Sequence, residues 1–321
     1  MKQKILVTGP TGFVGKQVVS DLLSKDAELY LLVRKNSETR FVDNESVHII
    51  EHESIEKYQG EGLPETLDSI VHLVAKAHVT ENEANRPEYQ RVNVEGTRNL
   101  LNIAREKSVS HFIYLSSIKV NGDVTEMNAF TEASSVDAQG VYAETKYQAE
   151  ELVRAYSQEG TQEARRVSIV RPPLVYGKGV KANMAALIEL VKLLPILPFG
   201  AIKNKRSLIS VRNLSDFLMT LLFQQPEQPY SSETFLVSDK HAMSTTALCM
   251  SIANGLDKKV FMPPIPAGFL TLLTSALGFK KHWQKLTSSI VIQGGNPKKY
   301  FNWIAPYDTD EEIKLLVKEL R

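Results

Sequence analysis

Short β-branched runs alternate with helical patterns through the first half of the chain. The runs lie at residues 4–8, 28–33, 47–50, 69–74 and 111–116, and the segments 15–24, 86–107 and 141–158 place apolar side chains on one helical face. Strands that alternate with helices in this way are typical of βαβ units. The pattern therefore predicts a parallel sheet covered by helices.

The regular alternation ends after a sixth predicted strand at residues 166–170. Arg171 is followed by two adjacent prolines, which cannot continue a central strand, so we expect the chain to leave the sheet there. Prolines and glycines then make the pattern irregular, which suggests a smaller lobe. Within this part we predict strands at residues 207–211 and 234–237 that return to the sheet, and a C-terminal helix that starts with the acidic residues 308–312.

Composition excludes several classes of protein. The 38 Lys and Arg residues nearly balance the 37 Asp and Glu residues, which argues against a binder of nucleic acid. The single cysteine, Cys249, cannot form an internal disulfide or a multi-thiolate metal site, so we expect a core role for it, no metal, and a reducing compartment. The N-terminus lacks the layout of a signal peptide, which predicts a cytoplasmic protein.

The most apolar stretch, residues 261–279, is interrupted by prolines and by Gly268. What remains is too short to span a bilayer, so no transmembrane segment is expected. We predict a buried or groove-lining helix here. An interfacial helix that touches a membrane is the alternative, which would matter if the substrate were linked to a lipid.

A glycine-rich turn follows the first predicted strand. Gly9, Gly12 and Gly15 stand three residues apart, directly before the first predicted helix. Glycine lets the backbone approach a pyrophosphate closely, and free N–H groups at the helix start face the anion. The turn therefore predicts a dinucleotide-binding cradle. The other residues of this cradle are Thr11, Phe13 and Val14.

The end of the second predicted strand bears on the choice of cofactor. NAD enzymes usually present a carboxylate there to the adenosine ribose, whereas an arginine suits the 2′-phosphate of NADP. Val33 and Arg34 stand at that end, which favours NADP over NAD. Glu53, after the third strand, is placed where an acid could contact the adenine.

Tyr142 and Lys146 lie four residues apart in a predicted helix, so their side chains share one face. A nearby ammonium stabilises tyrosinate, which suits Tyr142 to give and take a proton near neutral pH, and Lys146 could also hold the nicotinamide ribose. Ser117 follows the fifth strand, at the sheet edge where ligands collect, and could donate a hydrogen bond to the reacting oxygen. We predict these three as the catalytic group, the alternative being that Ser117 only caps a turn.

Together these motifs resemble an extended short-chain dehydrogenase/reductase of the NAD-dependent epimerase/dehydratase family, close to the UDP-glucose 4-epimerase branch. The resemblance spans nearly the full length. The segments that carry it are the glycine motif at residues 9–15, the runs 68–75 and 93–97, Ser117, Tyr142 with Lys146, and the run 206–212.

The resemblance implies a Rossmann-type doubly wound α/β sheet with a smaller, irregular C-terminal substrate lobe. Residues 1–172 and 207–240 would form the dinucleotide-binding domain, and residues 173–206 and 241–321 the lobe that binds a nucleotide sugar. Members of the family often form homodimers through the two helices represented here by residues 86–107 and 141–158.

The family also implies further contacts with the cofactor and the substrate. Asn93 would brace the active-site helix. Arg206 would meet the diphosphate of the sugar nucleotide, although a surface ion pair is the alternative for an arginine on a strand. The remaining implied contacts are Leu73, Val74, Ala75 and Pro172 with the cofactor, and Lys76 with the substrate.

Two departures from the family pattern leave the activity open. Val33 stands where epimerases of this group have the ribose-binding aspartate, and Leu174 stands where they have an asparagine on the diphosphate, a contact that Asn183 could replace. The expected activity is hydride transfer at C4 of a UDP-hexose or UDP-N-acetylhexosamine by a 4-epimerase of surface-polysaccharide metabolism. The alternatives are an NADPH-dependent UDP-4-keto-6-deoxyhexosamine C4 reductase and a non-catalytic NAD(P)-sensing regulator.

Overall fold

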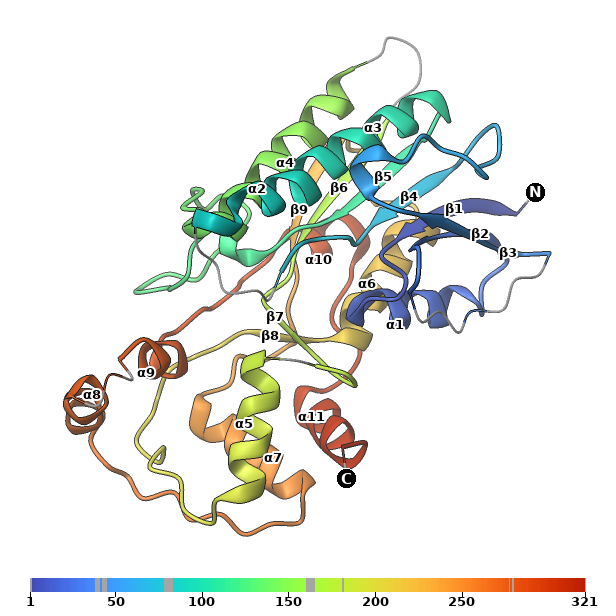
Figure 1. Ribbon diagram of the computed structural model, residues 1–321. Helices are drawn as coiled ribbons and strands as arrows, with labels where there is room; N and C mark the ends of the chain where they lie inside the picture. Colours follow the sequence, from blue (N-terminus) through green and yellow to red (C-terminus); the bar gives the residue numbers. More distant parts are fainter. Residues whose placement is uncertain are drawn as a thin grey trace.

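A seven-stranded parallel sheet forms the centre of the larger part of the molecule (Figure 1). The computed structural model describes residues 2–37, 41, 45–77, 83–159, 165–180, 182–276, 278 and 280–320. The strands of the sheet, in spatial order, are β3 (Val47–His52), β2 (Ala27–Arg34), β1 (Gln3–Thr8), β4 (Ser69–His72), β5 (His111–Leu115), β6 (Arg166–Arg171) and β9 (Ser232–Leu236). The order reverses between β1 and β4, and open α/β sheets bind ligands in the crevice at such a point.

Helices cover both faces of this sheet (Figure 1). One face packs against α1 (Phe13–Leu22), α6 (Val211–Phe223) and α10 (Asn296–Phe301), and the other against α3 (Gly96–Glu106) and α4 (Gly140–Gln158). Leu6 and Val7, neighbours on β1, point into opposite cores, which is why the strands are continuous apolar runs. The predicted Rossmann-type doubly wound fold is confirmed.

The predicted helix over residues 86–107 forms as three joined segments. These are α2 (Arg86–Tyr89), a π-helical stretch, η3 (Gln90–Glu95), and α3. The wider turn of a π-helix shifts the side chains that follow it and is frequent at functional sites. Here it carries the buried Asn93.

The smaller lobe begins where the chain leaves the sheet at Pro172. Its strands β7 (Leu174–Tyr176) and β8 (Leu208–Ser210) pair with each other in a separate two-stranded parallel sheet. The prediction that residues 207–211 return to the main sheet is therefore wrong, because β7 offers them a free edge first. The prediction for residues 234–237 is confirmed, since β9 pairs with β6.

Helices complete this lobe (Figure 1). They are α5 (Ala182–Leu193), α7 (Thr245–Gly255), α8 (Ala267–Ala276), α9 (Lys280–Thr287) and α11 (Thr309–Lys318). Cys249 lies in their shared core, as expected. The Asp308 carboxylate accepts hydrogen bonds from the backbone N–H groups of Asp310 and Glu311, so the acidic start of the C-terminal helix is confirmed.

The boundary between the two predicted domains stays a prediction. Tyr300 and Phe301 of α10 pack beside Phe235 of β9, so part of the C-terminal segment contacts the sheet side of the molecule. None of the described helices is both long and apolar enough to cross a membrane.

Candidate active site

The glycine turn leaves the start of α1 open. Gly9 has a φ of 70°, in the left-handed region that favours glycine, and Gly12 precedes the helix without a capping side chain. A Cβ atom on Gly15 would lie 2.0 Å from the carbonyl oxygen of Gly9, so no larger residue fits there. The turn thus fits a pyrophosphate, which helix N–H groups can bind from close range.

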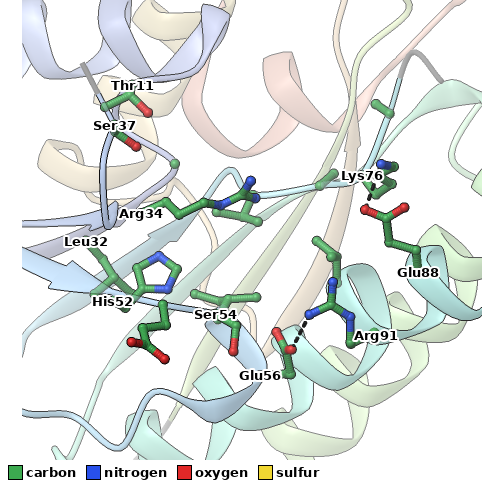
Figure 2. Close-up of a pocket in the computed structure, with 17 residues that line it drawn as sticks. Thr11, Leu32, Arg34, Ser37, His52, Ser54, Glu56, Lys76, Glu88 and Arg91 are labelled. Atoms are coloured by element: carbon green, nitrogen blue, oxygen red, sulfur yellow. Dashed lines mark hydrogen bonds and ion pairs between the residues drawn. The ribbon is translucent and has the colours of Figure 1, made fainter. Parts of the chain in front are cut away.

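A cavity of about 530 Å³ opens beside this turn (Figure 2). Its walls come from the carboxyl ends of β1 and β2, the segment after β3 and the segment after β4. The predicted site residues that line it are Gly9, Thr11, Arg34, Glu53, Val74, Ala75 and Lys76. Its position fits the adenosine part of a dinucleotide whose pyrophosphate lies on the turn.

Arg34 extends its side chain over the middle of the cavity (Figure 2). Other cations of the wall are neutralised: Lys76 pairs with Glu88 at 2.8 Å, and Arg91 pairs with Glu56 at 2.5 Å. Within the described part of the chain, no ion pair joins Arg34 to a carboxylate. A guanidinium at the end of β2 that forms no ion pair among the described residues has the chemistry to bind a phosphate monoester.

Lys146 is buried against the end of β5. Its Nζ donates a hydrogen bond to the carbonyl oxygen of Leu115 at 2.6 Å and lies 4.1 Å from the centre of the Tyr114 ring. Burial lowers the pKa of Lys146 to about 7, and the nearby Glu150 carboxylate opposes that shift. Tyr142 lies one turn earlier on α4 and is partly exposed, so a substrate can reach its phenol.

The two serines after β5 have different partners. Ser116 is buried, and its hydroxyl donates a hydrogen bond to Glu150 at 2.5 Å. Ser117 is partly exposed and caps η4 (Ile118–Val120), where its Oγ accepts a hydrogen bond of 3.3 Å from the backbone N–H of Lys119. Because this contact uses only a lone pair, the hydroxyl proton of Ser117 remains available for a substrate oxygen.

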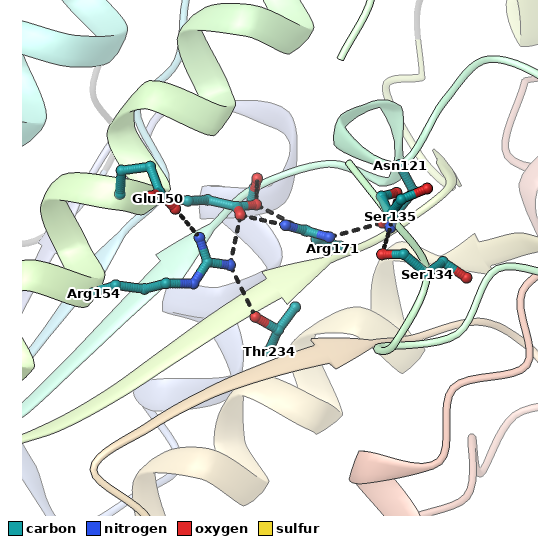
Figure 3. Close-up of polar contacts among 9 residues, drawn as sticks. Asn121, Ser134, Ser135, Glu150, Arg154, Arg171 and Thr234 are labelled. Atoms are coloured by element: carbon teal, nitrogen blue, oxygen red, sulfur yellow. Dashed lines mark hydrogen bonds and ion pairs between the residues drawn. The ribbon is translucent and has the colours of Figure 1, made fainter. Parts of the chain in front are cut away.

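A buried charged cluster lies beside α4, the helix of Tyr142 and Lys146 (Figure 3). Arg171, the last residue of β6, donates two hydrogen bonds to Glu150 of α4 and one to Asn121. Arg154 also contacts Glu150, at 2.9 Å. Burial on its own would raise the pKa of Glu150, but the hydrogen bonds and charges of Arg171 and Arg154 outweigh burial and lower it, so the carboxylate stays ionised.

A hydrogen-bond chain joins the end of β1, next to the glycine turn, to α4. His72 Nδ1 lies 2.8 Å from Thr8 Oγ1, and His72 Nε2 lies 3.0 Å from Thr97 Oγ1. Thr97 donates its hydroxyl proton to the carbonyl of Asn93, so Nε2 carries the imidazole proton. Asn93 then donates to Thr145 of α4 at 3.0 Å and accepts from the backbone N–H of Lys76.

Sequence reasoning gave no role to Glu150, Arg171 or His72. A usable signal was present for Glu150, which follows Lys146 at i+4 on the same helical face. Arg171 and His72 both stand at the carboxyl ends of central strands, at the edge where ligands collect.

The contacts of the remaining predicted residues do not test their expected roles in binding cofactor or substrate. Pro172 is buried, and its carbonyl accepts a hydrogen bond from the backbone N–H of Ile118, next to Ser117. The Leu73 backbone N–H binds Thr8. Arg206 donates hydrogen bonds to the carbonyl oxygens of Lys285 and Ser288, and Asn183 lies exposed on α5. These roles stay predictions.

Comparisons with known proteins agree with this geometry. Residues 5–237 match the NAD dependent epimerase/dehydratase family. The chain is 34% identical to a UDP-glucose 4-epimerase of Vibrio cholerae, over 98% of this chain and 94% of the relative. It is 24% identical to the N-acetyl-alpha-D-glucosaminyl-diphospho-ditrans,octacis-undecaprenol 4-epimerase of Escherichia coli O157:H7, over 84% and 78% of the two chains.

Solved structures share the whole fold. A UDP-glucose 4-epimerase of Thermotoga maritima, solved with UDP-glucose, superposes with a TM-score of 0.75 at 18% identity, over 99% of both chains. RMD from Pseudomonas aeruginosa, complexed with NADPH, superposes with a TM-score of 0.74 at 19% identity, again over 99% of both chains. The chain therefore belongs to the NAD-dependent epimerase/dehydratase family and is an NAD(P)-dependent enzyme of the short-chain dehydrogenase/reductase type.

Proposed function

We propose that the protein is a nucleotide-sugar 4-epimerase that acts on a UDP-hexose or a UDP-N-acetylhexosamine in surface-polysaccharide metabolism. The observation that carries this proposal is the likeness to the Vibrio cholerae epimerase over nearly the full length of both chains. The nucleotide turn and the group formed by Ser117, Tyr142 and Lys146 supply the parts that such chemistry needs.

Each residue of the site has its own role in the reaction at C4 of the sugar. A bound nicotinamide supplies the hydride chemistry. Tyr142 takes the proton of the C4 hydroxyl as the alcohol becomes a ketone, and returns it when the ketone is reduced on its other face. The ammonium of Lys146 stabilises the phenolate of Tyr142, and the Ser117 hydroxyl donates a hydrogen bond to the C4 oxygen.

The second candidate is an NADPH-dependent UDP-4-keto-6-deoxyhexosamine C4 reductase. Arg34 favours it, because a guanidinium beside the cavity suits the 2′-phosphate of NADPH, and a reductase takes up fresh NADPH in each turnover. Val33 also favours NADPH, because it stands where an NAD enzyme would have a carboxylate that binds the adenosine ribose.

One experiment separates the two activities. Purified enzyme is incubated with UDP-glucose or UDP-N-acetylglucosamine without added cofactor, and the sugars are followed by NMR. The epimerase proposal expects interconversion that is lost in Tyr142→Phe and kept in Tyr147→Phe, a control on the same helix. Absence of interconversion together with stoichiometric oxidation of NADPH by a UDP-4-keto sugar would overturn it in favour of the reductase. Unchanged turnover in Tyr142→Phe would show that Tyr142 does not transfer the proton, and it would contradict the proposed catalytic group.

We also propose a cytoplasmic homodimer that assembles through the exposed faces of α3 and α4. These helices lie side by side (Figure 1), and Arg105 of α3 binds Glu159, just after α4, through two hydrogen bonds. Light scattering of the purified protein tests the assembly, and a monomer at micromolar concentration would contradict it.

A further inference from the structure

The end of α5 lies on the side of the smaller lobe that faces away from the seven-stranded sheet (Figure 1). Large apolar side chains are exposed there. Leu193 ends α5, Ile196 follows it, and Phe261 lies beside them on a neighbouring segment. The two segments are joined through Phe261, whose N–H binds the carbonyl of Pro195 and whose carbonyl accepts from the N–H of Leu197. These side chains therefore form one local patch.

The short helix α8 extends the apolar surface. Leu270 of α8 is buried, and the indole N–H of Trp283 in α9 donates a hydrogen bond to Thr271, so α8 is held through one side. Phe269 and Leu272 lie in the open. Together with the patch after α5, the lobe exposes five large apolar residues that are each 57% to 72% exposed: Leu193, Ile196, Phe261, Phe269 and Leu272. We call these five the apolar face.

Charge around this face is strongly one-sided. Residues 258–287, which include α8 and α9, contain five lysines and neither aspartate nor glutamate. The whole chain carries a net charge of +1, so the rest of the chain carries −4. Lys259 and Lys280 are exposed; Lys259 stands two residues before Phe261, and Lys280 begins α9, which is tied to α8 by the hydrogen bond from Trp283 to Thr271. Lys258 binds the carbonyls of Val191, Lys192 and Leu194 with its ammonium, which holds the end of α5 in place.

We propose that the apolar face, with Lys259 and Lys280, docks the enzyme on the surface of an anionic lipid bilayer. Bulky apolar side chains next to lysines are the chemistry of interfacial membrane binding: the apolar groups enter the boundary of the acyl chains and the ammonium groups meet the anionic headgroups. The proposed attachment is peripheral and reversible, as is usual for binding through a few apolar groups and lysines.

A second copy of this chain is a poorer occupant of the same face. A symmetric contact would bring the lysines of two copies against each other, and like charges across an interface disfavour association. A soluble acidic protein would satisfy the lysines, but it offers no acyl boundary to receive five large apolar groups. The bilayer satisfies both features at once.

Vesicle sedimentation of the full-length protein tests the proposal. Vesicles of phosphatidylcholine with phosphatidylglycerol should carry the protein into the pellet, and pure phosphatidylcholine vesicles should do so at least about tenfold less well. Added salt should release the protein, because screening weakens the lysine contacts. Equal binding to both kinds of vesicle, or no binding to either, would overturn the proposal.

Matched variants locate the surface. Phe269→Ser combined with Leu272→Ser, and Lys259→Gln combined with Lys280→Gln, should each lower vesicle binding by about tenfold or more. Leu23→Ser, and Lys25→Gln combined with Lys57→Gln, remove similar exposed groups from the sheet side and should bind as the parent protein does. Parent-like binding by both lobe variants would show that this surface is not the attachment site.

Two further readouts separate the alternatives. A protein partner would show itself if the enzyme bound native cell membranes but lost that binding after protease treatment of the membranes, and this result would overturn the lipid assignment. Circular dichroism of each variant checks the fold. Since vesicle binding is measured without substrate or cofactor, its failure is independent of whether the 4-epimerase activity is found.

Discussion

Arg171 binds Glu150 through two hydrogen bonds, 2.8 Å from Nε and 2.5 Å from Nη2, with side chains that are only 3% and 0% exposed. Arg171 ends strand β6, and Glu150 lies one turn beyond Lys146 on α4. The pair therefore fastens α4 to the sheet edge and keeps a carboxylate next to the buried lysine.

Replacing Glu150 by glutamine should move the pH profile of the enzyme. Burial lowers the pKa of Lys146 to about 7, and the charge of Glu150 opposes that effect. Without the carboxylate the pKa of Lys146 falls further, so its ammonium is lost at a lower pH. The alkaline limb of kcat/KM should shift to lower pH, while Glu150→Asp, which keeps the charge, should stay closer to the parent profile. Equal profiles for the two variants would leave Glu150 a purely structural role.

Arg171→Met tests the structural side of the same pair. It leaves the Glu150 carboxylate buried without its main partner, and breaking a buried ion pair in this way typically costs about 3–5 kcal/mol of the free energy of unfolding. Chemical denaturation measures this loss. A change below about 1 kcal/mol would mean that Arg154, which also contacts Glu150, compensates for the missing guanidinium.

Two buried histidines should make the protein unstable in acid. Burial, with the charge of Lys146, lowers the pKa of His72 to about 3 from its usual 6.5, and burial lowers the pKa of His111 well below the usual value. Below pH 6.5 the unfolded chain binds protons that the folded protein cannot bind. His72 should thus remove about 1.4 kcal/mol of stability per pH unit as the pH falls from 6.5 towards 3, and His111 acts in the same direction.

The variant His72→Gln checks this assignment. The amide can keep a hydrogen bond to one of the two threonines but does not titrate, so the fall in stability between pH 6.5 and 4 should be shallower than in the parent. Urea unfolding at several pH values measures the slope. An unchanged slope would show that His72 does not contribute to the acid sensitivity.

The variant Gly15→Ala should lose its dinucleotide. The added Cβ would lie 2.0 Å from the carbonyl oxygen of Gly9, so the turn must open and the N–H groups at the start of α1 move away from the pyrophosphate. Fluorescence titration should show NAD(P) binding weakened by at least about tenfold. Gly268→Ala is the control, because a Cβ there meets no atom within 4 Å. If Gly15→Ala bound NAD(P) as tightly as the parent protein, the glycine turn would not be the dinucleotide-binding site.

Arg34→Ala should change the choice between the two cofactors. A charge-assisted hydrogen bond to the 2′-phosphate is worth about 1.5–3 kcal/mol, which predicts a loss of about 10- to 100-fold in NADP(H) affinity and little change for NAD(H). Lys35→Ala is the control, since Lys35 pairs with Glu53 at the surface and does not line the cavity. An equal loss of affinity for NAD(H) and NADP(H) would show that Arg34 contacts a group common to both cofactors and not the 2′-phosphate.

The sheet and the glycine turn could be predicted because their signals are local. Strands buried on both faces are apolar runs, and the spacing of Gly9, Gly12 and Gly15 needs only the neighbouring residues to be read. The pairing of β8 could not be predicted, since Leu208–Ser210 has the same pattern beside β7 as beside the main sheet. The π-helical stretch around Asn93 could not be predicted either, because one wider turn leaves the spacing of apolar residues along the helix almost unchanged.

Spacing within one helix predicts Tyr142 and Lys146 as a pair, but it does not predict the contacts that surround them. The contact between Glu150 and Arg171 depends on how α4 settles against β6, a tertiary fact that neither segment encodes alone. His72 carried no sequence signal beyond its place at a strand end. Its role becomes visible only when Thr8 and Thr97 are brought to its two ring nitrogens.

The separate pairing of β7 with β8 has a consequence for how such an enzyme can diversify. Three residues on each strand pair within this ribbon, and none of them takes a ladder position in the seven-stranded sheet. Insertions and exchanges beyond this ribbon can accumulate without disturbing the strands that carry Ser117 and the glycine turn. On the function proposed above, changes in the lobe would alter which sugar is bound while the hydride chemistry stays the same.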